Sequence, residues 1–419
     1  MKKVLIVSYN FPPLNTIASK RYGIMCKYFE QYGYEPYILT TRHDRNYIEW
    51  NVRFDLDLPV KEEHIIRLGK SRDNYAVSNK LIRFIIYLLE KGKIASATLD
   101  ARAFGWYEEV KKSIDLEKIR DVDIIIGTHP EMGNLYVARY LSNQIGCPYI
   151  IDIRDLISDY KEVPDCCKNI RWVDRIIEKA ILGKARGIVT VTPGFCRILK
   201  KRFPKNRFKV VFNGYENSLF NDQGRKARIE GSKDKYLYYA GSLYSHRLES
   251  FELLVKCLKK INHESGERVK LVIRSIGPKK LDTEAKKIVK WENMQEYIHI
   301  LEPVSEEVVR QEQENAYINI ILSTLHEDDR ALMTTIPGKL YELLNTKVPV
   351  LAIAQEKSDI GKVLNYAQKG VASASAESIS DFIMNDYKNY EGNENIKYFT
   401  RENQARKLCR FMDEVLEVT

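Results

Sequence analysis

One short segment in the second half of the chain has residue types that suit nucleotide phosphate binding. Pro337 and Gly338 favour the start of a helix, where unpaired backbone N–H groups and the positive end of the helix dipole attract phosphate. Lys339 adds a full charge there, and Leu340 opens the apolar stripe that would bury the helix. Glu342, one turn further on, can accept hydrogen bonds from ribose hydroxyls. An ordinary surface ion pair between Lys339 and Glu342 is the alternative interpretation.

A glycine-containing turn in the same half is a second candidate for phosphate binding. Gly241 and Ser242 follow the apolar run Tyr236–Ala240, and open parallel sheets bind ligands at the carboxyl ends of their strands. Gly241 permits close backbone approach, while Arg247 can bind an anion through two hydrogen bonds. Taken alone, Arg247 could equally be a solvated surface residue. Together, this turn and the Lys339 helix predict a pocket for a nucleotide diphosphate.

Two polar residues in the first half also come directly after strand-like runs. His129 follows an isoleucine-rich run, and Asp155 follows Tyr149–Ile153, so both are expected at the ligand-binding edge of a sheet. For His129 the alternative is a structural histidine near a turn. For Asp155 the alternative is that its neighbours Asp152 and Arg154 pair with each other and only hold the loop.

Short apolar runs that alternate with helical patterns predict the elements that position these residues. The runs are Val4–Val7, Pro36–Thr40, Ile124–Gly127, Tyr149–Ile153 and Gly187–Val191, then Tyr236–Ala240, Lys270–Ile273, Tyr297–Leu301, Tyr317–Leu322 and Val348–Ile353. This alternation is typical of parallel sheets covered by helices on both faces, so the fold class is α/β. A chain of 419 residues also exceeds what one core usually organises. We expect domains at 1–215 and 236–398, a polar linker at 216–235 and a terminal helix at 399–419.

Composition and charge exclude several classes of protein. With 44% apolar and 30% charged residues the chain is expected to be globular, and its net charge of +10 suggests an anionic partner. Seven cysteines are an odd number, and only Cys166 and Cys167 lie close in sequence, too close for an ordinary structural disulfide, so a reducing cytosol fits best and no metal site is expected. No apolar segment is long enough for a signal peptide or a membrane span. Nucleic-acid binding is disfavoured because no basic arm, zinc finger or stacking motif accompanies the charge.

The order of these motifs resembles the GT-B glycosyltransferases, specifically the retaining enzymes of glycosyltransferase family four that build bacterial polysaccharides. The resemblance covers nearly the whole chain and is carried by these pieces: Val4–Pro13 with Ser19–Arg21, Tyr34–Thr41, Thr128–Pro130, Asp152–Leu156, Phe212–Tyr215, Ala240–Tyr244, Gly338–Glu342 and Phe399–Leu408. It implies two Rossmann-like, doubly wound domains that face a central cleft. The first would take the acceptor, the second would bind the nucleotide sugar, and the terminal helix would cross back to the first.

The resemblance also implies roles for residues of the second domain. Arg247 and Lys339 match the pair that neutralises the diphosphate leaving group, which in this fold replaces a metal ion, so no cofactor is expected. Glu342 matches the ribose-binding glutamate. Thr334 stands where the family often has a second glutamate for the transferred sugar. The acidic run 327–329 (Glu-Asp-Asp) is a candidate substitute, with a solvated loop as the alternative.

In the first domain the resemblance points to the loop after the first strand. Family members usually carry paired glycines there, and this chain has Asn15 and Thr16, which are small enough to approach the donor phosphate. Arg21 matches a basic position after this loop, with a solvated helix charge as the alternative. His129 is expected to contact the transferred sugar, and Asp155 is expected to contact the acceptor hydroxyl.

The resulting expectation is a metal-independent, retaining glycosyltransferase that acts in surface polysaccharide synthesis. The donor would be a nucleotide diphosphate sugar, and the acceptor a glycan or polyprenyl-linked glycan. A nucleotide-sugar epimerase or hydrolase of the same fold is the alternative. We expect a cytoplasmic enzyme attached to anionic membrane by residues 78–94, whose cations Lys80, Arg83, Lys91 and Lys93 outnumber Glu90 and flank an apolar run. A helix packed on the domain's own sheet is the alternative for that segment.

Overall fold

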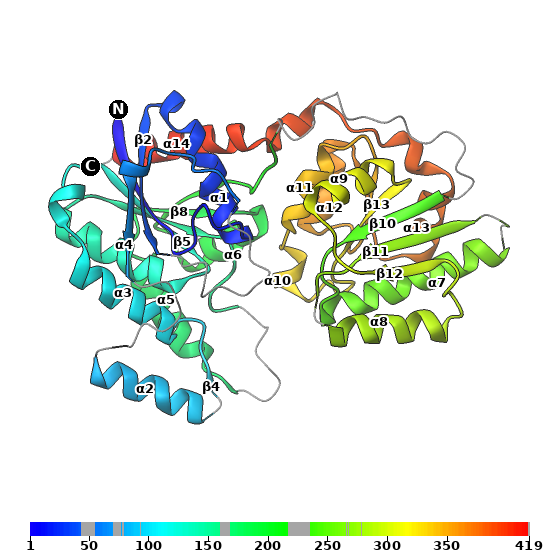
Figure 1. Ribbon diagram of the computed structural model, residues 1–419, viewed down its shortest axis with the longest axis horizontal. Helices are drawn as coiled ribbons and strands as arrows, with labels where there is room; N and C mark the ends of the chain where they lie inside the picture. Colours follow the sequence, from blue (N-terminus) through cyan, green and yellow to red (C-terminus); the bar gives the residue numbers. More distant parts are fainter. Residues whose placement is uncertain are drawn as a thin grey trace. The chain divides into compact units, whose positions relative to one another are not determined.

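A computed structural model describes residues 1–42, 55–69, 77, 79–92, 94–159, 168–216, 235–264, 266, 268–277 and 279–417. The chain forms two compact units (Figure 1). Unit 1 consists of Met1–Asn213 and Arg401–Thr419, and unit 2 consists of Gly214–Thr400. Most of the expected linker at 216–235 lies outside the described residues.

Unit 1 is built on a sheet of seven parallel strands in the order β3-β2-β1-β5-β6-β8-β9. The strands are β1 (Lys2–Val7), β2 (Tyr34–Thr41), β3 (Ile65–Leu68), β5 (Ile124–His129), β6 (Tyr149–Ile153), β8 (Gly187–Thr190) and β9 (Arg207–Val210). In the register of the sheet, Val4 of β1 lies opposite Pro36 of β2 and Ile124 of β5. From β1 the chain adds β2 and β3 on one side, and it then adds β5, β6, β8 and β9 on the other side of β1. The strand order therefore reverses between β1 and β5, and parallel sheets bind ligands at this kind of switch point.

Successive side chains along these strands point to opposite faces of the sheet, and helices cover both faces. The helices of unit 1 are α1 (Ile17–Met25), α2 (Lys80–Lys91), α3 (Ala101–Ser113), α4 (Met132–Ile145), α5 (Arg171–Leu182), α6 (Pro193–Arg202) and α14 (Arg401–Leu416). On β1, Leu5 and Val7 pack with α3, α4 and α6, whereas Val4 and Ile6 pack with α1 and α14. After Met25 the chain continues from α1 into two short 3₁₀ turns, Cys26–Tyr28 and Glu30–Tyr32.

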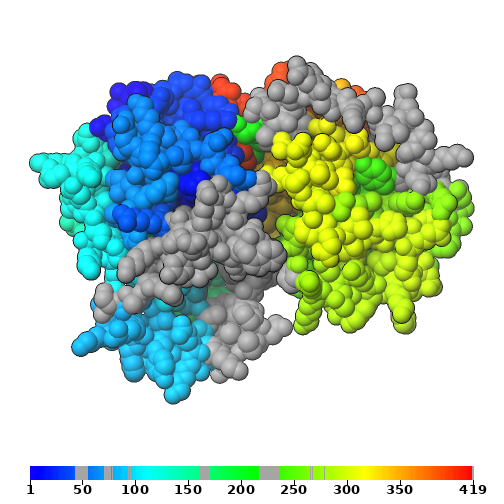
Figure 2. All heavy atoms as spheres, in the orientation of Figure 1, coloured from blue at the N-terminus to red at the C-terminus, as the bar shows by residue number. Residues whose placement is uncertain are grey.

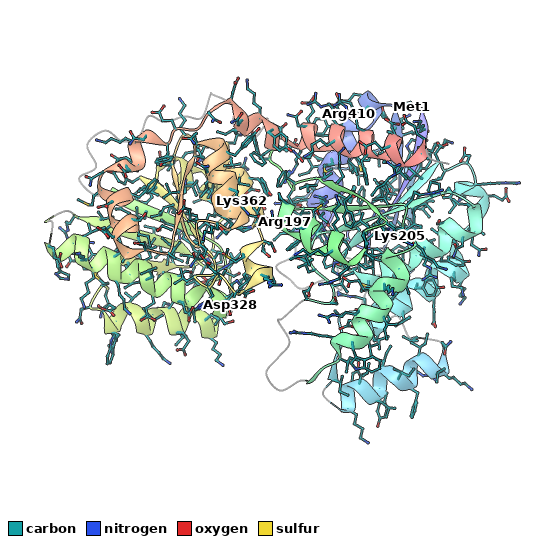
Figure 3. All side chains as sticks on the ribbon, turned by 180° about the vertical axis from the view of Figure 1, so that it is seen from behind. Met1, Arg197, Lys205, Asp328, Lys362 and Arg410 are labelled. Carbon is teal, nitrogen blue, oxygen red and sulfur yellow. The ribbon has the colours of Figure 1, made fainter. Side chains whose placement is uncertain are left out.

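The terminal helix α14 belongs to the core of unit 1. Phe411 is buried, and Lys2 Nζ lies 2.6 Å from the carboxylate of Asp413, so α14 lies beside β1. In Figure 3 the labels Arg410 and Met1 mark these neighbouring elements. The C-terminal segment therefore completes the fold of the N-terminal unit.

Unit 2 has a sheet of six parallel strands in the order β12-β11-β10-β13-β14-β15. The strands are β10 (Lys235–Ala240), β11 (Val269–Arg274), β12 (Ile298–Leu301), β13 (Ile318–Leu322), β14 (Val350–Ile353) and β15 (Gly370–Ser373). Its helices are α7 (Leu248–Glu264), α8 (Lys279–Trp291), α9 (Glu306–Asn315), α10 (Arg330–Met333), α11 (Gly338–Leu344), α12 (Asp359–Ala367) and α13 (Ala376–Met384). The switch point of this sheet lies between β10 and β13.

A smaller sub-structure connects α2 to the rest of unit 1. β4 (Ile94–Ala95) follows α2 and pairs in parallel with β7 (Lys168–Asn169), which leads directly into α5. Figures 1 and 2 show α2, in light blue, at the margin of unit 1, beyond α3 and α5. Within the described residues, no helix has the length and apolar character needed to traverse a bilayer.

Candidate functional site

The turn after β10 brings the chain close to α11. Gly241 has a φ of +143°, a conformation that side chains rarely adopt, and a Cβ at this position would lie 2.9 Å from Nζ of Lys339. The backbone conformation therefore favours glycine here, and the absence of a side chain leaves room for the ammonium group of Lys339. The turn brings together Gly241 and Lys339, which the sequence had separately indicated as phosphate-binding residues.

Lys339 does not form a surface ion pair with Glu342 through its ammonium group. Its Nζ donates a hydrogen bond of 2.9 Å to the carbonyl of Ala240 and lies 3.6 Å from the ring centroid of Tyr239, within cation–π range. Burial, and next the charge of Arg247, hold the pKa of Lys339 well below its usual value. Both causes disfavour the positively charged form of Lys339, and a bound anion would offset their effect.

Arg247 reaches the same tyrosine from the other side. Its Nη1 donates to the carbonyl of Ser242 at 2.9 Å and to the hydroxyl of Tyr239 at 3.3 Å. The Tyr239 hydroxyl in turn donates to the Ser242 carbonyl at 2.8 Å. Nε of Arg247 is buried, and no described residue accepts a hydrogen bond from it. In the described part of the chain neither Arg247 nor Lys339 pairs with a carboxylate, so two cations converge without a counter-ion.

Tyr239 is the site residue that sequence reasoning missed. It was assigned only to a core strand, yet it is the residue that both cations contact. The available signal was its position as the penultimate residue of β10, directly before the ligand-binding edge.

The remaining predicted residues of unit 2 lie around this pair. Gly338 is exposed at the start of α11, and Glu342 is half-buried one turn further along the same helix. The side chain of Leu340 is fully buried, and its N–H donates to the carbonyl of Pro337 at 3.0 Å. Leu340 therefore contributes packing that fixes the start of α11.

The threonine at the position of the family's second glutamate faces its own helix. The hydroxyl of Thr334 donates to the carbonyls of Arg330 and Ala331 at 2.8 and 3.1 Å. Among the three acidic residues upstream, Glu327 lies 3.7 Å from Nζ of Lys357 and Asp329 caps α10. Asp328 is exposed on the loop before α10 (Figure 3).

In unit 1, His129 ends β5 with a buried, neutral imidazole. Its Nδ1 is buried and has no hydrogen-bond partner among the described residues. Burial, and next the charge of Arg154, lower the pKa of His129 to about 3. Nε of Arg154 donates to the His129 carbonyl at 2.7 Å, which fixes the end of the strand. At neutral pH this ring can exchange hydrogen bonds with a ligand but carries no charge.

Arg21 is not the solvated helix charge that was one interpretation of it. Its Nε and Nη2 donate to the two carboxylate oxygens of Asp152 at 2.7 and 2.8 Å, and both side chains are buried. Asp152 therefore pairs with Arg21, and no local Asp152–Arg154 salt bridge holds the loop. Asp155, beyond the end of β6, is exposed.

The loop residues after β1 have local structural roles. Thr16 caps α1, because its hydroxyl accepts a hydrogen bond from the N–H of Ser19 at 3.2 Å. Nδ2 of Asn15 donates to Asp55 at 2.8 Å. Both residues lie at the carboxyl edge of the sheet, yet their side chains already have partners.

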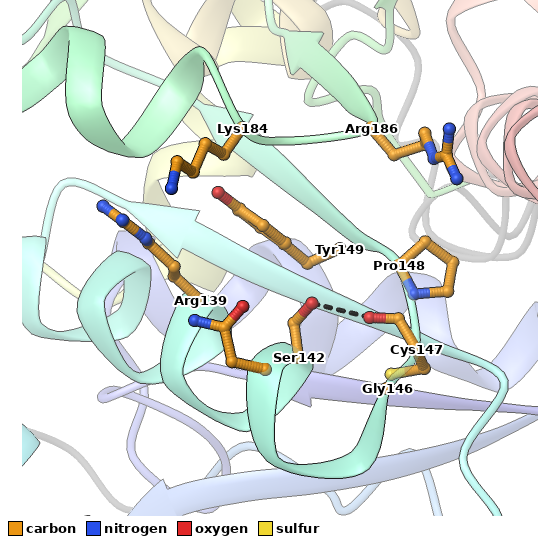
Figure 4. A pocket seen from close by; sticks show the side chains of 9 residues that line it. Arg139, Ser142, Gly146, Cys147, Pro148, Tyr149, Lys184 and Arg186 are labelled. Atoms are coloured by element: carbon orange, nitrogen blue, oxygen red, sulfur yellow. Dashed lines mark hydrogen bonds between the residues drawn. The ribbon is translucent and has the colours of Figure 1, made fainter.

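A separate hollow of about 430 Å³ lies at the amino edge of the unit 1 sheet (Figure 4). It is lined by Arg139, Ser142, Asn143, Gly146, Cys147, Pro148, Tyr149, Lys184 and Arg186. None of the predicted site residues lines it. Among the described residues, no group of three or more His, Cys, Asp or Glu side chains could hold a metal ion.

Solved structures share the architecture of this chain. Sucrose-phosphate synthase from Thermosynechococcus elongatus is 13% identical, with a TM-score of 0.66 and all of both chains covered. A glycosyltransferase from Rickettsia africae is 14% identical, with a TM-score of 0.62, covering 100% of this chain and 99% of that one. Anabaena HepE in complex with UDP and glucose is 9% identical, with a TM-score of 0.60, covering 99% of this chain and all of the other.

These likenesses confirm the predicted fold class, α/β of the GT-B type, with one parallel sheet in each unit. Comparison with protein-family models gave no match, and comparison with curated protein sequences gave none either. At such low identity the structural likeness defines the fold alone.

Proposed function

We propose that this chain is a glycosyltransferase that uses a nucleotide diphosphate sugar. The observation that carries the proposal is the convergence of Arg247 and Lys339 on Tyr239 without a carboxylate partner, at the carboxyl edge of a parallel sheet. Two cations that repel each other and lower a lysine pKa form a preorganised site for a dianion. The structural neighbours include a glycosyltransferase and a protein in complex with UDP and glucose, which supports this choice of ligand.

In the proposed reaction the bond between the anomeric carbon and the diphosphate oxygen breaks, and the acceptor oxygen bonds to that carbon on the same face. The electron pair of the broken bond stays on the departing diphosphate, which also takes up the proton of the acceptor hydroxyl. Arg247 and Lys339 stabilise the negative charge that develops on the departing diphosphate. Glu342 binds the ribose. In unit 1, neutral His129 offers a hydrogen bond to a sugar hydroxyl, and Asp155 contacts the acceptor hydroxyl. The cation pair takes the role of a metal ion, so we expect EDTA to leave activity unchanged.

Nucleotide binding tests the proposal directly. UDP, GDP and ADP should raise the melting temperature where uridine, guanosine and adenosine do not, because a ligand that binds only the folded state stabilises it. Arg247→Gln should abolish the shift. Lys290→Gln removes an exposed charge at the end of α8 in unit 2 and is the matched control. If diphosphates gave no shift, or if Arg247→Gln left it intact, the proposed site would be wrong.

Product analysis separates transfer from the alternative reactions of this fold. A transferase consumes donor only when an acceptor is present, whereas an epimerase or hydrolase converts donor alone. The acceptor we propose is a glycan or lipid-linked glycan used in surface polysaccharide synthesis. The support for a lipid-linked acceptor is the exposed apolar surface of α2.

We also propose that the enzyme is cytoplasmic and attaches peripherally to anionic membrane through α2. Its exposed apolar side chains are Leu81, Phe84, Ile85, Tyr87 and Leu88, and only Ile86 is buried. This exposure supports contact with a membrane over the alternative of a helix packed on the sheet. Lys80, Arg83 and Lys91 surround the apolar residues, while Ser78 and Lys93 lie outside the described residues.

A further inference from the structure

The outer face of α5 has the same two components as the exposed face of α2. Trp172 and Ile176 expose 68% and 60% of their surface and lie one turn apart. Arg171, Arg175 and Lys179 are exposed on the adjoining row, spaced four residues apart. At 3.6 residues per turn, all five side chains fall within an arc of about 140°. The outer face of α5 therefore combines apolar and positively charged side chains.

Both acidic residues of α5 are directed into the protein. Asp174 is buried and accepts hydrogen bonds from the hydroxyls of Ser96 and Thr98 at 2.6 and 2.7 Å. Glu178 is buried and accepts from Ser158 at 2.8 Å and from Arg202 at 2.9 Å. The described outer face of α5 consequently carries three positive charges and no negative one. A helix with this distribution of charge fits an anionic surface.

The fold attaches α2 and α5 to the same small sheet. α2 ends at Lys91, shortly before β4, and α5 begins at Arg171, directly after β7. β4 and β7 pair in parallel with Ile94 opposite Lys168, so one two-stranded sheet connects α2 with α5. Asp174 strengthens this link, because the residues it binds follow β4. Figure 1 shows α2 and β4 at the same margin of unit 1.

We propose that the outer face of α5 and the exposed face of α2 together form one docking surface for an anionic lipid bilayer. Trp172 and Ile176 enter the interface beside the apolar residues of α2, and Arg171, Arg175 and Lys179 contact lipid phosphates. The occupant is a lipid surface because both helices expose large apolar side chains beside cations that have no carboxylate partner among the described residues. This inference rests on the membrane attachment proposed for α2 and adds a second element to it.

Vesicle flotation with variants of each helix tests the surface. We would compare vesicles of phosphatidylglycerol with vesicles of phosphatidylcholine. The α5 variant changes Arg171, Arg175 and Lys179 to Gln, the α2 variant changes Lys80, Arg83 and Lys91 to Gln, and the control changes Lys280, Lys286 and Lys290 on α8 to Gln. We expect the α5 and α2 variants each to partition at least about tenfold less onto phosphatidylglycerol, and the control to match the wild type.

The fluorescence of Trp172 gives a second measurement that does not depend on removing charge. Lipids with brominated acyl chains should quench the protein's tryptophan emission, and Trp172→Phe should remove most of that quenching. Trp291→Phe is the matched control, since Trp291 is exposed on α8 of unit 2. Quenching that Trp172→Phe leaves unchanged would overturn the placement of α5 at the bilayer.

The outcomes separate this inference from the proposed function. If the α5 variant floats like the wild type while the α2 variant does not, the role of α5 is wrong and attachment through α2 stands. If the wild type binds neither kind of vesicle, both membrane claims are wrong. The melting-temperature shift with UDP, measured on the same variants, reports the transferase site independently of lipid.

Discussion

Arg21 and Asp152 form a bidentate ion pair inside unit 1, with N···O distances of 2.7 and 2.8 Å. The hydroxyls of Tyr22 and Thr128 also donate to Asp152, at 3.0 and 3.2 Å. Nη2 of Arg21 reaches the carbonyl of Val211 at 3.1 Å. This one pair therefore connects α1 with β5, β6 and the segment that follows β9.

Breaking this pair from one side should destabilise unit 1. Asp152→Asn leaves a buried guanidinium without its counter-charge, which typically lowers the free energy of unfolding by about 3–5 kcal/mol. Adding Arg21→Met to that variant should cost much less than the sum of the single changes, because the orphaned charge disappears. Urea unfolding followed by fluorescence measures both. Additive losses, or an unaffected Asp152→Asn protein, would contradict the role of the pair.

The strands that sequence patterns identified are mainly the central ones. Tyr149–Ile153 was predicted with its observed bounds, since a strand paired on both sides and buried on both faces needs a continuous apolar run. The strands missed in the main sheets, β3, β9 and β15, all lie at sheet edges. An edge strand has one neighbour, so polar residues as in Arg207–Val210, or small ones as in Gly370–Ser373, are tolerated there.

The sequence predicted those residues of the candidate site that lie at the ends of strands. Gly241 and His129 could be placed from their positions after apolar runs, because parallel strands end at one common edge. The contact of Arg247 and Lys339 with Tyr239, and that of Arg21 with Asp152, depend on segments far apart in sequence. Such contacts follow from the packing of helices on the sheet, which hydrophobic periodicity does not specify.

His129 should make unit 1 sensitive to mild acid. Its pKa is lowered to about 3 in the folded protein, and an unfolded histidine titrates near about 6.5. Between these values the unfolded chain binds a proton that the folded chain does not, so stability falls as pH drops below about 6.5. The loss from this one group reaches about 2 kcal/mol at about pH 5.

The variant His129→Asn isolates this effect. The stability advantage of wild type over His129→Asn in urea should be smaller at mildly acidic pH than above neutrality. The exposed residue His263 provides a control, because His263→Asn should show no such change with pH. An advantage that stayed constant across this range would show that His129 is accessible to protons in the folded state.

Glu342 should determine the preference for a ribonucleotide. A carboxylate that accepts hydrogen bonds from ribose hydroxyls contributes about 1.5–3 kcal/mol to binding. Glu342→Ala should therefore weaken the binding of UDP by this amount. The variant should bind UDP and 2′-deoxy-UDP with nearly equal affinity. Calorimetry measures both affinities, with Glu377→Ala as an exposed control on α13. If Glu342→Ala kept the wild-type preference for UDP, the ribose contact would lie elsewhere.

Diphosphate binding should be accompanied by proton uptake at Lys339. Burial and the charge of Arg247 keep the pKa of this lysine well below its usual value in the free protein. A bound diphosphate favours the charged form and should raise that pKa, so above the lowered value the complex gains up to one proton and affinity falls as pH rises. Calorimetry in Tris and in HEPES detects the uptake, because the two buffers release protons with different enthalpies. Lys339→Met should abolish the buffer dependence, and Lys290→Gln on α8 should retain it. Uptake that persisted in Lys339→Met would place the titrating group elsewhere.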